Sequence, residues 1–231
     1  MRVLPTTTRT LIERMSLFHG LAHPTIARIA ALATRRVFED AAVVFMRGDP
    51  GDSLYAVVSG RVRISASGRG GKEVFLNIME PGDAFGEIAL LDGSPRTATA
   101  TVMARTELMI IQRRPFFELL RTEPQLVAHL IQLLCRRVRW TAEMMEDSAL
   151  LSLPARLAKR LLSLARLHGQ HTPTGTKLRI SQEELAQFLG LSRQIVNQHL
   201  RTWGDRSWIA TGRGNVTITN VRALKNITHD S

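Results

Sequence analysis

Several features that would point to particular protein classes are missing from this 231-residue chain. It contains a single cysteine, Cys135, which excludes an intrachain disulfide and a cysteine-rich metal or cluster site. No apolar run reaches the roughly 20 residues that a membrane-spanning helix needs. Residues 1–10 are polar and are followed by Glu13 and Arg14, so the apolar core of a signal peptide is absent. We therefore expect a cytoplasmic protein without a membrane partner.

Catalytic motifs are missing as well. The chain has no Ser-His-Asp arrangement, no HExxH, no P-loop and no dinucleotide-binding fingerprint. Its histidines are scattered rather than clustered, as at His129, His168, His171 and His199. An enzyme is the alternative class, and no motif supports it. We expect no catalytic residues, no metal site and no enzymatic activity.

Positive charge is abundant and unevenly distributed. The chain carries a net charge of +11. The part from Pro154 onward contains twelve Lys and Arg residues and four acidic residues, which gives it a net charge of +8. A basic C-terminal part behind a nearly neutral N-terminal part favours a nucleic acid as partner.

The segment 84–101, AFGEIALLDGSPRTATAT, combines residues suited to a nucleotide. Gly86 lets the backbone approach a ligand, and a short helix from Glu87 would present free N–H groups to an anion. Arg96 and Thr97 supply donors for phosphate, and the Glu87 carboxylate can accept from a sugar hydroxyl. The alternative is that Glu87 and Arg96 form a buried ion pair that fixes a turn, and spacing alone leaves both interpretations open.

Short strand-like runs surround this segment. Between residues 37 and 111 they alternate with Gly, Asp and Pro turns, as expected for an antiparallel barrel or jelly roll with room for a small ligand. The runs are Val43–Phe45, Leu54–Val58, Arg61–Ile64, Val74–Ile78 and Leu108–Ile111. Short helices are expected before them, in residues 6–34.

A long helix is predicted from Gln125. One apolar stripe follows steps of four and three residues, which is typical of pairing with a partner helix: Val127, Ile131, Leu134, Val138, Thr141 and Met145. A second stripe could lie against the roll: Leu126, Leu130, Leu133, Trp140 and Met144. Two stripes favour a homodimer, although a helix packed wholly within its own chain remains the alternative. Residues 147–154 are expected to form a hinge, with Pro154 starting the next domain.

The basic C-terminal part has the pattern of a winged helix-turn-helix. Ser181 and Glu184 form a capping box, Gly190 ends the first helix and Ser192 caps the second. Ile195, Val196 and Leu200 are expected on the buried side of the second helix, and residues 208–218 as a hairpin wing. Arginine suits guanine, and glutamine and asparagine suit adenine, so the candidate base-reading residues are Arg193, Gln194, Asn197 and Gln198. Ser181 and Ser192 are placed to contact phosphate. A protein-interaction domain is the alternative.

Together these patterns resemble the Crp/Fnr family of cyclic-nucleotide-responsive transcription regulators. The resemblance rests on the FGEIAL opening at residues 85–90, the later PRTA at 95–98, the GDxGDxLYxVxxG pattern at 48–60, and the helix 190–200. It implies an α+β chain with a cyclic-nucleotide-binding β-roll (1–115), a dimerisation helix and hinge (116–153) and a winged helix-turn-helix domain (154–231). Its oxygen-sensing branch, which holds an iron–sulfur cluster through several cysteines, is excluded by the single Cys135.

The resemblance also implies ligands and roles. It implies cAMP or cGMP as an allosteric ligand, with no metal, and a homodimer on a two-fold symmetric site in double-stranded DNA, with RNA polymerase as a further partner. The implied ligand-binding residues are Gly86, Glu87, Ile88, Ala89, Arg96, Thr97, Arg137 and Thr141. The alternative is a family member that responds to another signal, such as haem-bound gas, or to no ligand. His19 and His23 do not identify an axial haem ligand.

Three departures from the family bear on specificity. Ala142 stands where the cAMP receptor has a serine beside the threonine, so one purine contact is missing. Gln194 replaces a glutamate and Gln198 an arginine in the reading helix. We therefore expect an operator half-site that keeps the guanine read by Arg193 and loses the preference for a second guanine.

Overall fold

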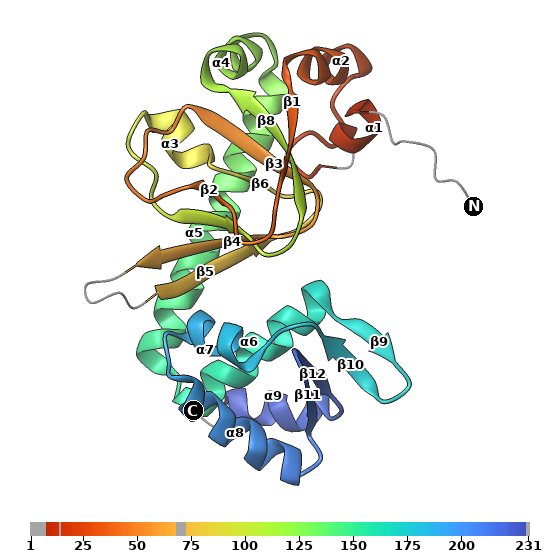
Figure 1. Cartoon of the computed structure of the whole chain (residues 1–231), viewed down its shortest axis with the longest axis vertical. Coiled ribbons are helices and arrows are strands. Elements are labelled where there is room, and N and C mark those ends of the chain that lie inside the picture. The colour runs from red at the N-terminus through yellow and green to blue at the C-terminus, as the bar shows by residue number, and fades with distance from the viewer. Residues whose placement is uncertain (1–7, 14, 68–72, 230–231) are drawn as a thin grey trace. The chain divides into compact units, whose positions relative to one another are not determined.

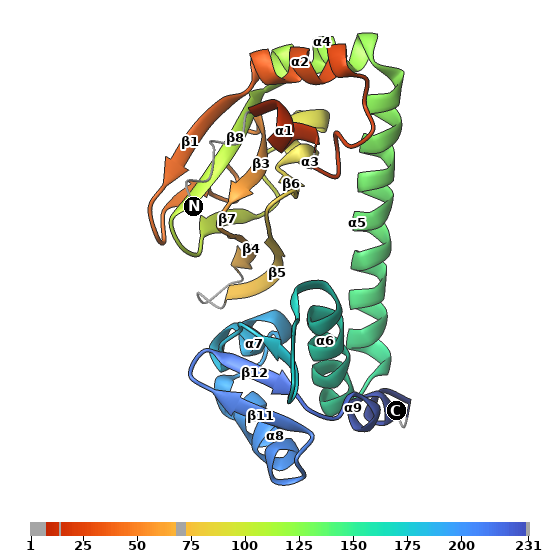
Figure 2. The same ribbon diagram turned by 90° about the vertical axis from the view of Figure 1, so that its right-hand side faces the viewer.

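The computed structural model describes the chain except for residues 1–7, 14, 68–72 and 230–231 (Figure 1). The described residues form two compact units. The first takes in those up to Ser67 and Leu76–Arg137, and the second those from 68 to 75 and from Val138 onward. Helix α5 (Pro124–Leu150) runs through both as one continuous helix (Figure 2). No helix in the described part of the chain is long and apolar enough to span a membrane.

Two four-stranded antiparallel sheets build the roll, in the orders β1-β8-β3-β6 and β2-β7-β4-β5. Their strands are β1 (Thr34–Phe38), β2 (Val43–Phe45), β3 (Ser53–Ser59), β4 (Val62–Ser67), β5 (Glu73–Met79), β6 (Ala84–Phe85), β7 (Thr99–Val102) and β8 (Thr106–Gln112). The predicted α+β roll is confirmed. Three strands had not been predicted: β1, of which only Phe38 is buried, the two-residue β6, and β7.

Short helices accompany the sheets of the first unit, and the last of these helices leads directly into α5. They are α1 (Thr8–Glu13), α2 (His23–Leu32), α3 (Glu87–Asp92) and α4 (Arg113–Thr122). Glu123 joins α2 to the start of α5, because its carboxylate accepts from Thr25 Oγ1 at 2.8 Å and from Arg28 Nη1 at 2.7 Å. The core beneath these helices includes Phe18, Ile26, Ile29, Leu54, Ile111 and Phe116.

The two predicted stripes of α5 have different surroundings. Leu126, Leu130 and Leu133 are buried in the core of the roll unit, as expected. The expectation that Trp140 and Met144 continue this stripe against the roll is wrong, because both contact Arg160 of the next helix in the second unit. The other stripe is exposed at Ile131, Val138, Thr141 and Met145.

The second unit combines four helices after α5 with a four-stranded antiparallel sheet in the order β11-β12-β10-β9. Its elements are α6 (Leu153–His168), β9 (Gln170–Thr172), β10 (Gly175–Leu178), α7 (Gln182–Leu189), α8 (Arg193–Asp205), β11 (Ile209–Gly212), β12 (Asn215–Ile218) and α9 (Val221–His229). The expected helix-turn-helix and wing are confirmed, whereas β9, β10 and α9 had not been predicted. The expected hinge is shorter than predicted, because α5 continues to Leu150 and α6 begins at Leu153.

Candidate ligand cassette and nucleic-acid interface

Glycine makes possible the backbone of the segment 84–101, which we call the ligand cassette. Gly86 follows β6 and precedes α3 with φ +82°, a conformation that residues with a Cβ rarely adopt. A Cβ there would also lie 2.7 Å from Arg96 Nη1 and 3.2 Å from the Ser53 carbonyl oxygen. A Cβ on Gly51 would lie 2.2 Å from Cβ of Ala89 on α3. The turn at Gly86 and helix α3 therefore pack so closely against the roll that neither Gly51 nor Gly86 has space for a Cβ atom.

Arg96 is buried beside this turn. Its Nη1 donates to the Gly86 carbonyl oxygen at 2.8 Å and its Nη2 to the Ser53 carbonyl oxygen at 2.9 Å. Its guanidinium lies 4.3 Å from the ring centroid of Phe45 and 5.6 Å from that of Tyr55. The Nε atom is buried and has no hydrogen-bond partner among the described residues.

Burial lowers the pKa of Arg96, and the nearby Tyr55, Asp52, Asp49 and Glu87 oppose this effect only in part. The side chain still carries its charge at neutral pH, since an arginine does not lose its proton in proteins. Within the described part of the chain no carboxylate lies within 4.0 Å of the guanidinium. Arg96 is thus a buried cation held by carbonyls and rings, and its buried Nε–H is unsatisfied among the described residues.

The Glu87 carboxylate has a different partner from the one that the ion-pair alternative requires. Glu87 is 3% exposed, and its Oε1 lies 3.4 Å from Nε of Arg137 on α5. Arg137 also donates from Nη2 to the Ala84 carbonyl oxygen at 3.0 Å. Glu87 and Arg96 are both buried, as that alternative expected, but they do not pair with each other. Arg137 joins α5 to the cassette.

The structure therefore brings Gly86, Glu87, Arg96 and Arg137 together, and Ala89 lies on the buried side of α3. Ile88 is 40% exposed and Thr97 is exposed, so their side chains face outward in the single chain. Thr141 is exposed on α5 in the second unit. Sequence reasoning missed Phe45, Tyr55 and the Ser53 carbonyl, which surround Arg96. They come from β2 and β3, far from Arg96 in the sequence, and the 48–60 pattern that contains Ser53 and Tyr55 does not identify them as neighbours of Arg96.

The helix-turn-helix forms by the predicted local interactions. Ser181 Oγ accepts from the Glu184 backbone N–H at 3.1 Å, and Glu184 Oε2 accepts from the Ser181 backbone N–H at 2.6 Å. Gly190 ends α7 with φ +65°, and Ser192 Oγ accepts from the Ile195 backbone N–H at 3.4 Å to cap α8.

The expected burial of α8 needs one correction. Val196 and Leu200 are buried, but Ile195 is 37% exposed, and Trp203 takes the third buried position. Positions 196, 200 and 203 follow the four-and-three spacing of one helix face, whereas residue 195 lies on a neighbouring face.

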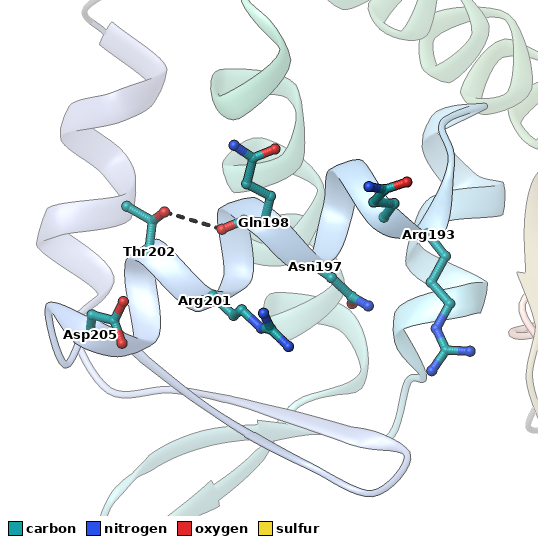
Figure 3. A pocket seen from close by; sticks show the side chains of 7 residues that line it. Arg193, Asn197, Gln198, Arg201, Thr202 and Asp205 are labelled. Atoms are coloured by element: carbon teal, nitrogen blue, oxygen red, sulfur yellow. Dashed lines mark hydrogen bonds between the residues drawn. The ribbon is translucent and has the colours of Figure 1, made fainter.

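The polar side chains of α8 line a surface hollow of about 660 Å³ (Figure 3). Arg193, Asn197 and Arg201 lie along one side of the helix at four-residue intervals, and Gln198 projects from another (Figure 3). The hollow is lined by Arg193, Gln194, Asn197, Gln198, Arg201, Thr202 and Asp205. All four predicted base-reading residues thus line the same hollow. Sequence reasoning missed Arg201, which the repeated spacing of four from Arg193 could have indicated.

Asn197 has an unusual environment on this face. Its Oδ1 is buried and has no hydrogen-bond partner among the described residues. A buried amide oxygen without a donor costs free energy. Asn197 is therefore a candidate for contact with a partner that supplies a donor.

Two domain families match this chain. Residues 35–123 match the cyclic nucleotide-binding domain family, and residues 155–227 match the Crp-like helix-turn-helix domain family. Among the described residues, no group of three or more His, Cys, Asp or Glu side chains could hold a metal ion. The fold and the two matches define a DNA-binding transcription regulator that carries a cyclic nucleotide-binding domain.

Similar whole proteins agree with this class. The CRP-like cAMP-activated global transcriptional regulator of Mycobacterium tuberculosis is 34% identical over 218 residues, which cover 93% of this chain and 96% of that protein. The cyclic AMP receptor protein of Thermus thermophilus is 32% identical, over 91% of this chain and 95% of that protein. The solved structure of the c-di-GMP responsive global regulator CLP of Xanthomonas campestris is 27% identical with a TM-score of 0.76, and the match covers 85% of this chain and 99% of that one. The chain belongs to the Crp/Fnr family.

Proposed function

We propose that this chain forms a homodimer whose affinity for a two-fold symmetric DNA operator changes when cAMP or cGMP binds in the cassette. The observation that carries the proposal is the buried guanidinium of Arg96, which has neither a carboxylate partner nor an acceptor for its Nε–H among the described residues. Leaving a buried cationic donor unsatisfied is costly, and an anionic phosphate oxygen is the acceptor that would relieve that cost. One relative is named a cAMP-activated regulator and another a cyclic AMP receptor protein, and these names favour the same ligand class.

Each cassette residue has a distinct proposed role. Arg96 binds the cyclic phosphate, with help from the Thr97 hydroxyl and from the backbone of Gly86, Ile88 and Ala89. Glu87 accepts from a ribose hydroxyl while Arg137 holds its carboxylate in place. Thr141 contacts the purine from the partner subunit. The proposed division is a nucleotide-binding roll (1–115), a dimerisation helix and hinge (116–153) and a DNA-binding domain (154–231).

Dimerisation is proposed through the exposed stripe of α5. Ile131 is 55% exposed, and Val138 and Met145 are both 69% exposed. Apolar side chains at this spacing form the seam of a two-stranded coiled coil. A second copy of α5 would cover them and would bring Thr141 to the interface.

Operator reading is proposed for the polar face of α8. Arg193 reads a guanine, and Gln194, Asn197 and Gln198 read positions that favour A·T pairs. Ser181 and Ser192 contact phosphates at the starts of α7 and α8. In a dimer the two α8 helices would meet half-sites roughly 34 Å apart.

Calorimetric titration with cAMP, cGMP and c-di-GMP tests the ligand, with c-di-GMP included because of the relative CLP. Arg96→Lys keeps a positive charge but loses the planar fork of donors, so we expect at least tenfold weaker nucleotide binding. Arg105→Ala is the matched control, because this arginine is exposed and 3.7 Å from Glu39. Fluorescence anisotropy with labelled operator DNA, with and without nucleotide, then tests the coupling. No binding heat with cAMP or cGMP, or an unchanged DNA affinity, would contradict the proposal.

A further inference from the structure

Helix α6 carries three cationic side chains that contact other helices of the second unit. Arg156 donates from Nη2 to the Leu189 carbonyl oxygen at the end of α7, at 3.1 Å. Lys159 pairs with Asp147 of α5, which is buried. Arg160 is the most deeply buried of the three, with 9% of its surface exposed. Helix α6 thus bridges the end of α5 and the first helix of the helix-turn-helix.

Arg160 makes its contacts with two helices at once. Its guanidinium carbon lies 5.8 Å from the ring centroid of Trp140 on α5 and 5.5 Å from that of Phe188 on α7. Its Nη2 also contacts the sulfur of Met144 on α5. Its Nε is buried without a hydrogen-bond partner among the described residues, and burial lowers the pKa of this side chain.

This environment is costly for a purely structural residue. A buried cation loses its hydration, and Arg160 has ring faces and a sulfur in place of a carboxylate at hydrogen-bond distance. An apolar side chain of similar length would fill the same space without that cost. The interaction energy of a planar cation between two rings, however, depends steeply on the positions of both rings. Its energy therefore links the position of Trp140 to that of Phe188.

The position of Trp140 in the sequence connects this pair of contacts to the proposed nucleotide site. Trp140 directly precedes Thr141, the residue proposed to contact the purine, so a change at Thr141 acts on the same turn of α5. Phe188 lies on α7, which joins the reading helix α8 through the turn at Gly190.

We propose that Arg160 is a positioning residue that couples the nucleotide-dependent state of α5 to the orientation of the reading helix. Movement of Trp140 shifts the guanidinium, and the guanidinium shifts Phe188 and the helix pair that contains it. This inference rests on the proposed function, because it requires that a nucleotide alters DNA affinity.

The test is the ratio of the operator dissociation constants measured without and with saturating cAMP. Arg160→Met removes the cation and keeps an unbranched apolar side chain. We expect the ratio to fall about fivefold, while nucleotide affinity in the absence of DNA stays within about twofold of wild type. By linkage, the gain in cAMP affinity that operator DNA produces must fall by the same factor. Arg166→Met, which alters an exposed arginine of the same helix, is the matched control and should keep the wild-type ratio.

A structural role for Arg160 predicts a different outcome. Arg160→Met would then lower the midpoint of thermal unfolding and leave the ratio unchanged, and this result would overturn the inference while the proposed function stands. A wild-type ratio of one would overturn both.

Two further variants keep the test decisive if Arg160→Met does not fold. Arg160→Lys retains the charge without the planar group, so its ratio should lie between those of wild type and Arg160→Met. Trp140→Leu should reduce the ratio by a similar factor, and adding it to Arg160→Lys should reduce the ratio by less than the product of the two effects. Full multiplicative effects would show that the two residues act independently and would refute the coupling.

Discussion

Replacing Val138 by glutamate tests the dimer seam directly. The Val138 side chain is 69% exposed in the single chain, so the substitution removes little packing from the monomer. Glutamate is also a better helix former than valine. The fold of each unit should survive, and the effect should fall on association.

The structure sets the size of that effect. Complete burial of a valine is worth about 1.5–3 kcal/mol, and about two-thirds of this surface remains to be buried by a partner, which gives about 1–2 kcal/mol in each chain. Two chains lose about 2–4 kcal/mol, and two carboxylates brought together at the seam add repulsion. Because about 1.4 kcal/mol corresponds to tenfold, the dimer dissociation constant should rise by roughly 30-fold to several hundredfold.

Sedimentation velocity over a dilution series measures this constant. Gln132→Glu is the matched control, because it adds the same charge at an exposed position of α5 outside the seam. We expect Gln132→Glu to sediment as the wild-type chain does and Val138→Glu to dissociate at concentrations where the wild type remains paired. Equal dissociation constants for Val138→Glu and wild type would refute the assignment of this stripe to the dimer.

Three other variants, one of them a double substitution, test the remaining parts of the site. Gly51→Ala places a Cβ 2.2 Å from that of Ala89, so the unfolding free energy should fall by about 1–3 kcal/mol in urea titrations and nucleotide binding should weaken; an unchanged urea midpoint would contradict the close packing. Ser181→Ala breaks the capping box and should cost about 0.5–2 kcal/mol of stability by the same measurement, with no loss if the cap is unimportant. Gln198→Arg, combined with Gln194→Glu, should restore preference for a second guanine worth about 1–3 kcal/mol when binding sites are selected from random DNA. Selection by the wild type of a half-site with both guanines as its clear optimum would refute the assigned reading residues.

Much of the candidate interface could be predicted from the sequence because its signals are local. The capping box of Ser181 and Glu184, the glycine at 190 and the cap at Ser192 each involve residues at most four positions apart. The exposed stripe of α5 follows from helical periodicity in the same way. The contributions of these residues to ligand and DNA binding stay predictions, since the free chain shows their placement and not their partners.

The environment of the buried cations could not be predicted, because it depends on residues far apart in the chain. The 3.6-residue period indicated that Trp140 and Met144 lie on one face of α5, but it could not identify what covers that face. Spacing likewise left open whether Glu87 pairs with Arg96, and the fold pairs Glu87 with Arg137 instead.

The sequence alone determined the helices with their caps, the turns, the α+β class and the basic character of the C-terminal part, since these follow from periodicity and composition within short windows. Tertiary structure decided what each buried charge contacts. Arg96 donates to Ser53, 43 residues away, and Arg160 lies between rings from α5 and α7. A desolvated charge interacts with the carbonyl or ring that the packed elements bring near it, and only the complete fold specifies which group that is.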